Sequence, residues 1–193
     1  MKNLPNILTL SRVIFLPLLL FMILSSNFQL NMYSVVLFIA ISFTDFLDGF
    51  IARNQGSTSD FGKMLDPIAD KILVAAALIL LVMNGTIKNY EVIAAIIILT
   101  REILISGLRE FLAKGQVTMQ VTSLSKLKTF IQMISIAILL TGESGNKIIN
   151  FQDYNAQTIG IILLWLSAFL TLYTGYDYLR KGIDHAINED SKN

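Results

Sequence analysis

The sequence predicts an all-α, polytopic membrane protein with six transmembrane helices and a short N-terminal interfacial helix. Three observations predict this fold class. Apolar residues make up 54% of the 193 residues, and the mean hydropathy is +0.63. Charged residues make up 15%, well below the roughly 25% of a soluble domain. The apolar residues also come in long runs, which is typical of spanning helices. We expect one domain over residues 1–193.

Each predicted span is close to the roughly 20 residues that a helix needs to cross a bilayer. The spans are expected at residues 8–26, 32–52, 64–83, 90–112, 123–141 and 158–179. All should be helical, because unpaired backbone polar groups cannot face lipid. Residues 1–10 mix polar and apolar positions and predict the interfacial helix. Residues 186–193 are polar and are expected to form a flexible tail. The first span is not expected to be a cleaved signal, since no small-residue cleavage site follows it.

The basic residues predict the orientation. If the N-terminus is cytoplasmic, the outer connections hold only Lys88 and Lys147. The remaining assigned basic residues lie on the inner side: Lys2, Arg12, Arg53, Lys63, Lys71, Arg109, Lys114, Lys126, Lys128, Arg180 and Lys181. This excess predicts that both termini are cytoplasmic. No nucleic-acid partner is expected.

Four of the five aspartates in the stretch TDFLDGFIARNQGSTSDFGKMLDPIADK are Asp45, Asp48, Asp66 and Asp70. Asp45 and Asp48 are three residues apart, and Asp66 and Asp70 are four apart, so each pair lies on one helical face. The apolar runs beside them are too short to span alone, so we expect all four near the inner membrane boundary. A charged side chain at membrane depth indicates a functional site.

These spacings favour a metal site. Neighbouring carboxylates repel each other, and a divalent cation would offset that repulsion. The chain has no cysteine and one histidine, His185, so oxygen ligands and a hard ion such as Mg²⁺ or Mn²⁺ are expected, with two ions suiting phosphate chemistry. The candidate metal ligands are Asp45, Asp48, Asp66 and Asp70. Asp70 is also the candidate general base.

The alternative interpretation is a salt-bridged surface cluster. Arg53, Lys63 and Lys71 are near enough in sequence to pair with the aspartates. Gly49 and Gly62, which allow backbone or ligand to approach closely, favour the metal site instead.

The segment resembles the signature of the CDP-alcohol phosphotransferase family. The matching positions are Asp45, Asp48, Gly49, Ala52, Arg53, Gly62, Asp66 and Asp70. The resemblance implies six transmembrane helices, a homodimer and a divalent-metal site open to the cytoplasm. It further implies that Asp70 activates the acceptor hydroxyl and that the other three aspartates bind metal. Gly49, Ala52, Arg53 and Gly62 would then shape the CDP pocket.

Three further blocks, LPNILTLSRVIFLP, TREILISGLRE and SKLKTFIQM, are similar to the bacterial phosphatidylglycerophosphate synthases. That subfamily joins CDP-diacylglycerol and glycerol 3-phosphate and releases CMP. The similarity implies an integral protein of the bacterial cytoplasmic membrane, with membrane lipid around it. Asn6 and Thr9 are further candidates for contact with the nucleotide.

An anionic acceptor needs fixed cations. The candidates are Arg12, Arg101, Arg109, Lys126 and Lys128. By helical spacing Glu102, Ser106 and Arg109 share one face, and Ser125, Lys128 and Gln132 share another. Anchoring at lipid headgroups is the competing interpretation for the cations near span ends. Trp165, Tyr173, Tyr176 and Tyr178 are expected to be packing or interfacial-belt residues.

Two classes of alternative function stay open. The same chemistry could use inositol phosphate, serine or a second phosphatidylglycerol as acceptor. A divalent-cation transporter, with the four aspartates as its ion site, or a non-catalytic lipid-binding protein would also explain intramembrane acids.

Overall fold

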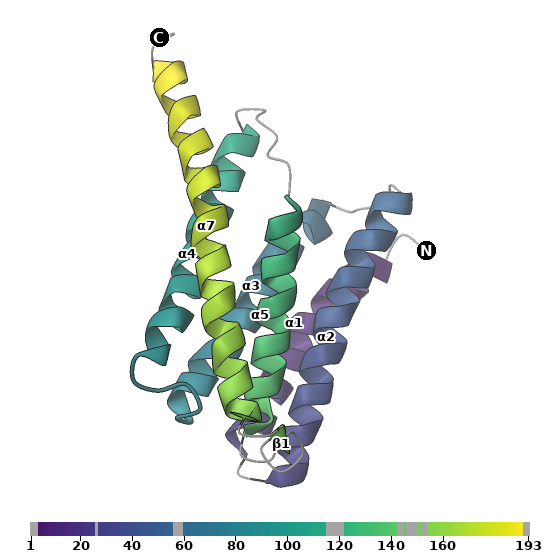
Figure 1. Ribbon diagram of the computed structural model, residues 1–193. Coiled ribbons are helices and arrows are strands. Elements are labelled where there is room, and N and C mark those ends of the chain that lie inside the picture. The colour runs from purple at the N-terminus through teal and green to yellow at the C-terminus, as the bar shows by residue number, and fades with distance from the viewer. Residues whose placement is uncertain are drawn as a thin grey trace.

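The computed structural model describes residues 4–25, 27–55, 60–114, 122–142, 145, 150–151 and 154–190. Within these ranges, the side chains of residues 4–13, 28, 45–55, 60–67, 114, 150–151, 154, 181 and 184–190 lie outside the description. The described chain forms a bundle of helices with a small hairpin at one end (Figure 1). This confirms the all-α prediction, apart from the hairpin.

The helices lie close to the positions that the apolar runs predicted. They are α1 (Leu4–Leu24), α2 (Phe28–Gln55), α3 (Asp60–Met83), α4 (Glu91–Lys114), α5 (Ser123–Leu140) and α7 (Ala156–Asp190). Two-residue strands, β1 (Asn150–Phe151) and β2 (Tyr154–Asn155), pair antiparallel before α7. Several helices are longer than expected, because polar residues continue the helices beyond the apolar runs.

Local capping fixes the helix ends. A side-chain oxygen accepts a hydrogen bond from a backbone N–H in the first turn of three helices. The acceptor is Asn27 for α2 (2.9 Å), Thr122 for α5 (3.2 Å) and Asn155 for α7 (2.9 Å). These bonds satisfy donors that a helix start leaves unpaired. Gly85, with φ +74°, follows the end of α3 in the left-handed conformation that glycine adopts readily.

The chain runs up and down the bundle, so the two termini lie at the same end, opposite the hairpin (Figure 1). Helix α7 packs against α4 and α5, whereas α1 packs against α2 and α3. The two groups meet where α2 packs against α5 and where α3 packs against α4 and α5. The end of α2 and the start of α3, which carry the four aspartates, lie at the end with the termini.

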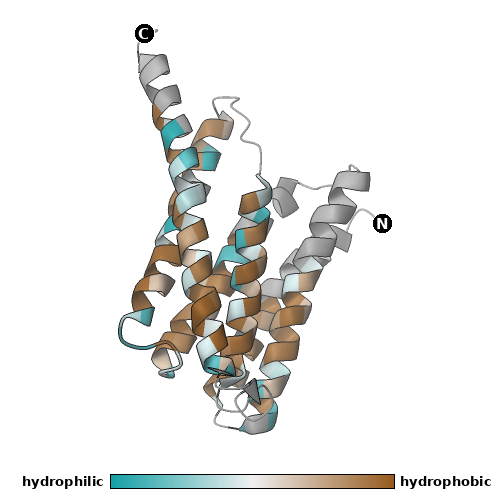
Figure 2. Ribbon diagram, in the orientation of Figure 1, coloured by the Kyte–Doolittle hydropathy of each residue, from teal (hydrophilic) through white to brown (hydrophobic). Residues whose placement is uncertain are grey.

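Large apolar residues lie both inside and outside the bundle. The interior contains Leu19, Phe38, Leu78, Ile98, Ile136, Leu139 and Leu164. Apolar side chains are also exposed on every long helix, among them Phe21, Phe43, Ile79, Ile96, Phe130 and Phe169. Figure 2 shows apolar residues over the middle of the helices and hydrophilic residues toward their ends. An apolar surface of this extent is typical of a surface that faces lipid.

Small and polar residues occupy contacts between helices. The Ser135 hydroxyl donates to the Gly160 carbonyl oxygen at 2.8 Å, joining α5 to α7. A Cβ at Gly160 would lie 2.7 Å from two side-chain carbons of Leu139, so the glycine lets these helices approach closely. Small residues and interhelical hydrogen bonds of this kind are typical of packing inside membranes.

The predicted count of six spans goes beyond what length and apolarity establish. Among the described residues, Ser123–Leu140 and Ala156–Arg180 are long and apolar enough to cross a bilayer. Helices α1 and α2 contain shorter apolar stretches, Ile14–Leu24 and Gln29–Thr44. In α1, α2 and α3 the described side chains cover only part of each helix, whereas Arg101 and Glu102 interrupt the apolar run of α4.

The separate interfacial helix was predicted wrongly. Residues 4–10 form the first turns of α1, which continues to Leu24. Pro5 lies in the first turn, where its missing N–H is tolerated, so nothing separates these residues from the span. At the other end, α7 continues to Asp190, so residues 186–190 of the expected tail have helical backbone.

Candidate active site

An ion-paired centre joins α4 to α5. The Glu102 carboxylate pairs with the Lys128 ammonium of α5, and Arg101 Nη1 lies 3.4 Å from the same carboxylate oxygen. Lys128 is only 3% exposed, and a buried charge is stable only when it is paired. Headgroup anchoring is therefore the wrong interpretation for Lys128. We call Arg101, Glu102, Arg109 and Lys128 the basic cluster.

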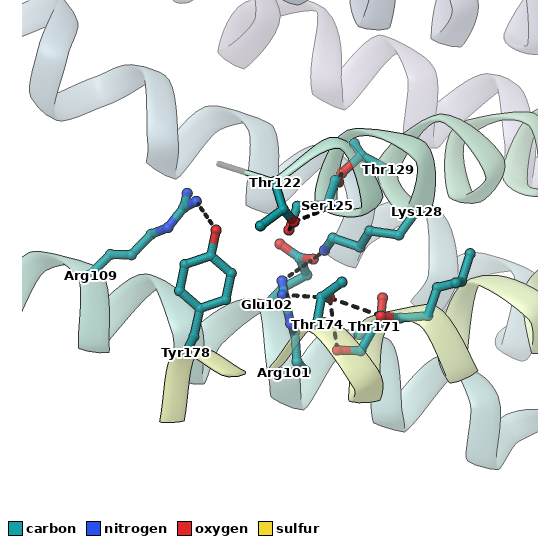
Figure 3. Close-up of polar contacts among 11 residues, drawn as sticks. Arg101, Glu102, Arg109, Thr122, Ser125, Lys128, Thr129, Thr171, Thr174 and Tyr178 are labelled. Carbon is teal, nitrogen blue, oxygen red and sulfur yellow. Dashed lines mark hydrogen bonds and ion pairs between the residues drawn. The ribbon is translucent and has the colours of Figure 1, made fainter. Parts of the chain in front are cut away.

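Helix α7 holds the Arg101 guanidinium in place (Figure 3). Arg101 Nη2 donates to Thr174 Oγ1 at 3.0 Å, and that hydroxyl donates in turn to the Leu170 carbonyl oxygen at 2.8 Å. A Cβ at Gly175 would lie 3.2 Å from Arg101 Cγ and 3.3 Å from its Nε. The glycine therefore leaves room for the arginine side chain to lie against α7.

Tyr178 of α7 contacts both arginines of the cluster. Its hydroxyl accepts a hydrogen bond from Arg109 Nη2 at 2.9 Å. The guanidinium carbons of Arg109 and Arg101 lie 5.0 and 5.8 Å from its ring centroid, within cation–π range. Tyr178 is 5% exposed. The prediction that it serves only packing or the interfacial belt is therefore incomplete.

The basic cluster carries more positive than negative charge. Arg101, Arg109 and Lys128 contribute three cations, and Glu102 contributes one carboxylate. Arg101 Nε and Thr171 Oγ1 are also buried with no hydrogen-bond partner in the described part of the chain. Surplus cationic donors of this kind suit an anion such as a phosphate group.

A pocket lies beside the cluster, between α3, α4 and α5. Asp70 and Lys71 line it from α3, Glu102 from α4, and Thr129 and Gln132 from α5. Asp70 and Glu102 thus line the same pocket, although they lie on different helices and far apart in the sequence. The pocket therefore connects Asp70 to the basic cluster through Glu102, whose carboxylate pairs with Arg101 and Lys128.

The other predicted site residues are placed by their backbone alone. Asp45, Asp48, Gly49, Ala52 and Arg53 lie in α2, Gly62 and Asp66 lie in α3, and Asn6, Thr9 and Arg12 lie in α1. Their side chains are outside the described set. Lys126, by contrast, is described and exposed, on a different side of α5 from the buried Lys128.

Sequence reasoning missed the contribution of α7. Thr171, Thr174 and Tyr178 follow helical spacing (i, i+3, i+7) and are all buried. Three hydroxyl-bearing residues along one side of an apolar helix were the available signal. Nothing in the sequence, however, indicated which helix they would face.

The donor set fits a hard divalent ion. Among the side chains that the structure describes, no group of three acidic, histidine or cysteine residues is close enough to hold a metal. Three of the four candidate ligands, Asp45, Asp48 and Asp66, lie outside that set. The described helices carry all four aspartates at one end of the bundle, and carboxylate oxygens are the ligands that Mg²⁺ and Mn²⁺ prefer.

Known proteins share this sequence over most of its length. It is 44% identical to the CDP-diacylglycerol–glycerol-3-phosphate 3-phosphatidyltransferase of Rickettsia typhi, over 93% of this chain and 97% of that protein. It is 33% identical to the protein of the same name from Bacillus subtilis, over 94% and 95%. It is 38% identical to the CDP-diacylglycerol–glycerol-3-phosphate 3-phosphatidyltransferase 2 of Arabidopsis thaliana, over 93% of this chain and 79% of that protein.

The family model for CDP-alcohol phosphatidyltransferases matches residues 2–173, which include both the aspartate segment and the basic cluster. This match agrees with the resemblance that the aspartate spacing indicated. The chain therefore belongs to the CDP-alcohol phosphatidyltransferase family.

Proposed function

We propose that this protein transfers the phosphatidyl group of CDP-diacylglycerol to sn-glycerol 3-phosphate, giving phosphatidylglycerophosphate and CMP in phospholipid biosynthesis. The observation that carries the proposal is the position of the basic cluster beside the pocket that Asp70 lines. The acceptor of this reaction is an anion with a free hydroxyl, so it needs cations and a proton acceptor close together. The names of the similar proteins support the same reaction.

The basic cluster would bind the phosphate of the acceptor. Arg101 is fixed by Thr174 and Arg109 by Tyr178, so neither guanidinium has to be ordered when the anion arrives. Arg12 and Lys126 remain candidates for the same phosphate. Binding the phosphate at the cluster would direct the carbon chain of glycerol toward the pocket.

Asp70 would act as the general base. Its carboxylate takes the proton of the 1-hydroxyl of glycerol 3-phosphate, and the freed oxygen attacks the β-phosphorus of CDP-diacylglycerol. The bond from that phosphorus to the bridging oxygen breaks, and CMP leaves with the bridging oxygen. One phosphorus–oxygen bond forms and one breaks, and the acceptor proton ends on Asp70.

Asp45, Asp48, Asp66 and Asp70 would hold Mg²⁺ or Mn²⁺, with two ions in our proposal. The bound metal would offset the charge of the pyrophosphate. Gly49, Ala52, Arg53 and Gly62 would form the CDP pocket, with Asn6 and Thr9 nearby. The family supports dependence on a divalent metal.

We also propose one domain of six membrane-spanning helices, a homodimer, and an active site on the cytoplasmic side of the bacterial cytoplasmic membrane. The exposed apolar residues on the long helices support the membrane position. The termini at one end of the bundle are consistent with an even number of crossings (Figure 1).

The test is CMP release by purified protein supplied with CDP-diacylglycerol, Mg²⁺ and a panel of alcohols. We expect release with glycerol 3-phosphate far above that with serine, inositol phosphate or phosphatidylglycerol. Release only with another alcohol would replace the acceptor. Metal flux in proteoliposomes without CMP release would favour a cation transporter, and neither activity would favour a lipid-binding protein.

A further inference from the structure

Gln132 has a buried carboxamide oxygen that lacks a hydrogen-bond partner. The residue is 2% exposed, and its Oε1 accepts no hydrogen bond within the described part of the chain. Buried polar atoms are nearly always hydrogen-bonded, because leaving one unpaired is costly. An unpaired acceptor therefore indicates that a donor is supplied from elsewhere.

That donor would come from the occupant of the pocket. Gln132 lines the pocket together with Asp70, Lys71, Glu102 and Thr129. None of these described side chains, Lys71 included, donates a hydrogen bond to Oε1. The Thr129 hydroxyl already donates to the Ser125 carbonyl oxygen at 3.1 Å, and ionised carboxylates only accept hydrogen bonds. A hydroxyl group on the occupant would satisfy Oε1.

The order of residues around the pocket indicates which hydroxyl this is. Lys128 and Gln132 are one helical turn apart on the same buried face of α5, and Asp70 borders the pocket from α3. If the phosphate lies at Lys128 and the reacting hydroxyl at Asp70, the carbon between them passes Gln132. In glycerol 3-phosphate that carbon carries the 2-hydroxyl.

We infer that Gln132 is a specificity-determining residue that accepts a hydrogen bond from the 2-hydroxyl of the acceptor. This inference rests on the proposed function and adds the recognition of a secondary hydroxyl next to the phosphate. Gln132 then selects a vicinal diol phosphate over a simple hydroxyalkyl phosphate of the same length. A pocket built to hydrogen-bond a substrate hydroxyl discriminates strongly against an analogue that lacks it.

The test compares two acceptors, sn-glycerol 3-phosphate and 3-hydroxypropyl phosphate, which lacks the 2-hydroxyl. Wild-type protein should use the first with a kcat/KM higher by about tenfold or more. Gln132→Met keeps a side chain of similar length. In this variant kcat/KM for sn-glycerol 3-phosphate should be only about one- to threefold that for 3-hydroxypropyl phosphate. Most of the change should come from slower use of glycerol 3-phosphate.

Gln29→Met is the matched control, because Gln29 is exposed at the far end of α2; it should keep the wild-type ratio. A merely structural role for Gln132 would lower both rates together and leave the ratio unchanged, which would overturn the inference. The wild type alone also tests it, whether or not the variant folds. Equal use of both acceptors overturns the inference but leaves the proposed function standing, whereas no CMP with either acceptor overturns both.

Discussion

The aspartate segment of α2 and α3 and the basic cluster of α4 and α5, which α7 supports, are built in different ways. The aspartates lie within residues 45–70 of one helical hairpin. The groups of the basic cluster and its supports lie between Arg101 and Tyr178, on three helices. Spacing along the chain defines the first region, whereas tertiary packing creates the second.

The comparison assigns different tasks to the two regions. Asp70 and its neighbours would carry out the chemistry and hold the CDP-lipid, whereas the basic cluster would bind the acceptor anion. Variants in the first region should therefore lower turnover, and variants in the second should raise the KM for the acceptor.

The largest effect is expected for Asp70→Asn. The substitution keeps the shape of the side chain but removes the proton acceptor, so CMP release should fall by roughly 10²–10⁴-fold. Steady-state CMP release measures it. Asp177→Asn, at an exposed position of α7, is the control and should behave as the wild type. Near-normal turnover in Asp70→Asn would remove its assignment as base.

The next effect is expected for Arg101→Gln. The variant loses a charge that Thr174 and Glu102 hold in place, so the KM for glycerol 3-phosphate should rise by about 10- to 100-fold. The KM for CDP-diacylglycerol should change little. Arg180→Gln, at an exposed position of α7, is the matched control and should leave both KM values unchanged. Equal changes in both KM values would contradict the division of tasks.

A third variant tests the ion pair itself. Glu102→Gln leaves the buried Lys128 ammonium without its carboxylate, so the free energy of unfolding should fall by about 3 kcal/mol. Denaturant unfolding in detergent micelles measures the change. Adding Lys128→Met should restore part of the loss. Glu110→Gln, on an exposed position of α4, should have no such effect, and additive losses in the double variant would argue against the pair.

The smallest effect is expected for Tyr178→Phe. The ring stays between the arginines, but the 2.9 Å hydrogen bond to Arg109 is lost, so the KM for glycerol 3-phosphate should rise by about three- to tenfold. Acceptor titration at saturating CDP-diacylglycerol measures it. Tyr176→Phe, on the exposed face of α7, should leave the KM unchanged. If both variants behave alike, Tyr178 does not orient Arg109.

The sequence predicted the parts of the molecule that depend on local pattern. Apolar runs located the helices to within a few residues at most ends. Ser125, Lys128 and Gln132, which were predicted to share one face of α5, are all buried. The helix ends were less predictable, because polar residues extend α2 and α7 beyond the apolar runs. The first turns of α1 join the span for the same reason.

The arrangement of the basic cluster could not be predicted in this way. Helical spacing placed Glu102 on one face of its helix and Lys128 on one face of another. It could not show that these two faces lie opposite each other. The contacts of Arg101 with Thr174 and Gly175 depend on how α7 crosses α4. Packing between distant helices decides those contacts, and a single sequence carries no spacing rule for them.

The most direct test of the central claim is equilibrium binding of glycerol 3-phosphate without the CDP-lipid, by calorimetry on purified protein. Wild type and Asp70→Asn should bind with similar affinity, while Arg101→Gln should bind about tenfold or more weakly. Unchanged binding in Arg101→Gln, or loss of binding in Asp70→Asn, would contradict the assignment of the acceptor phosphate to the basic cluster.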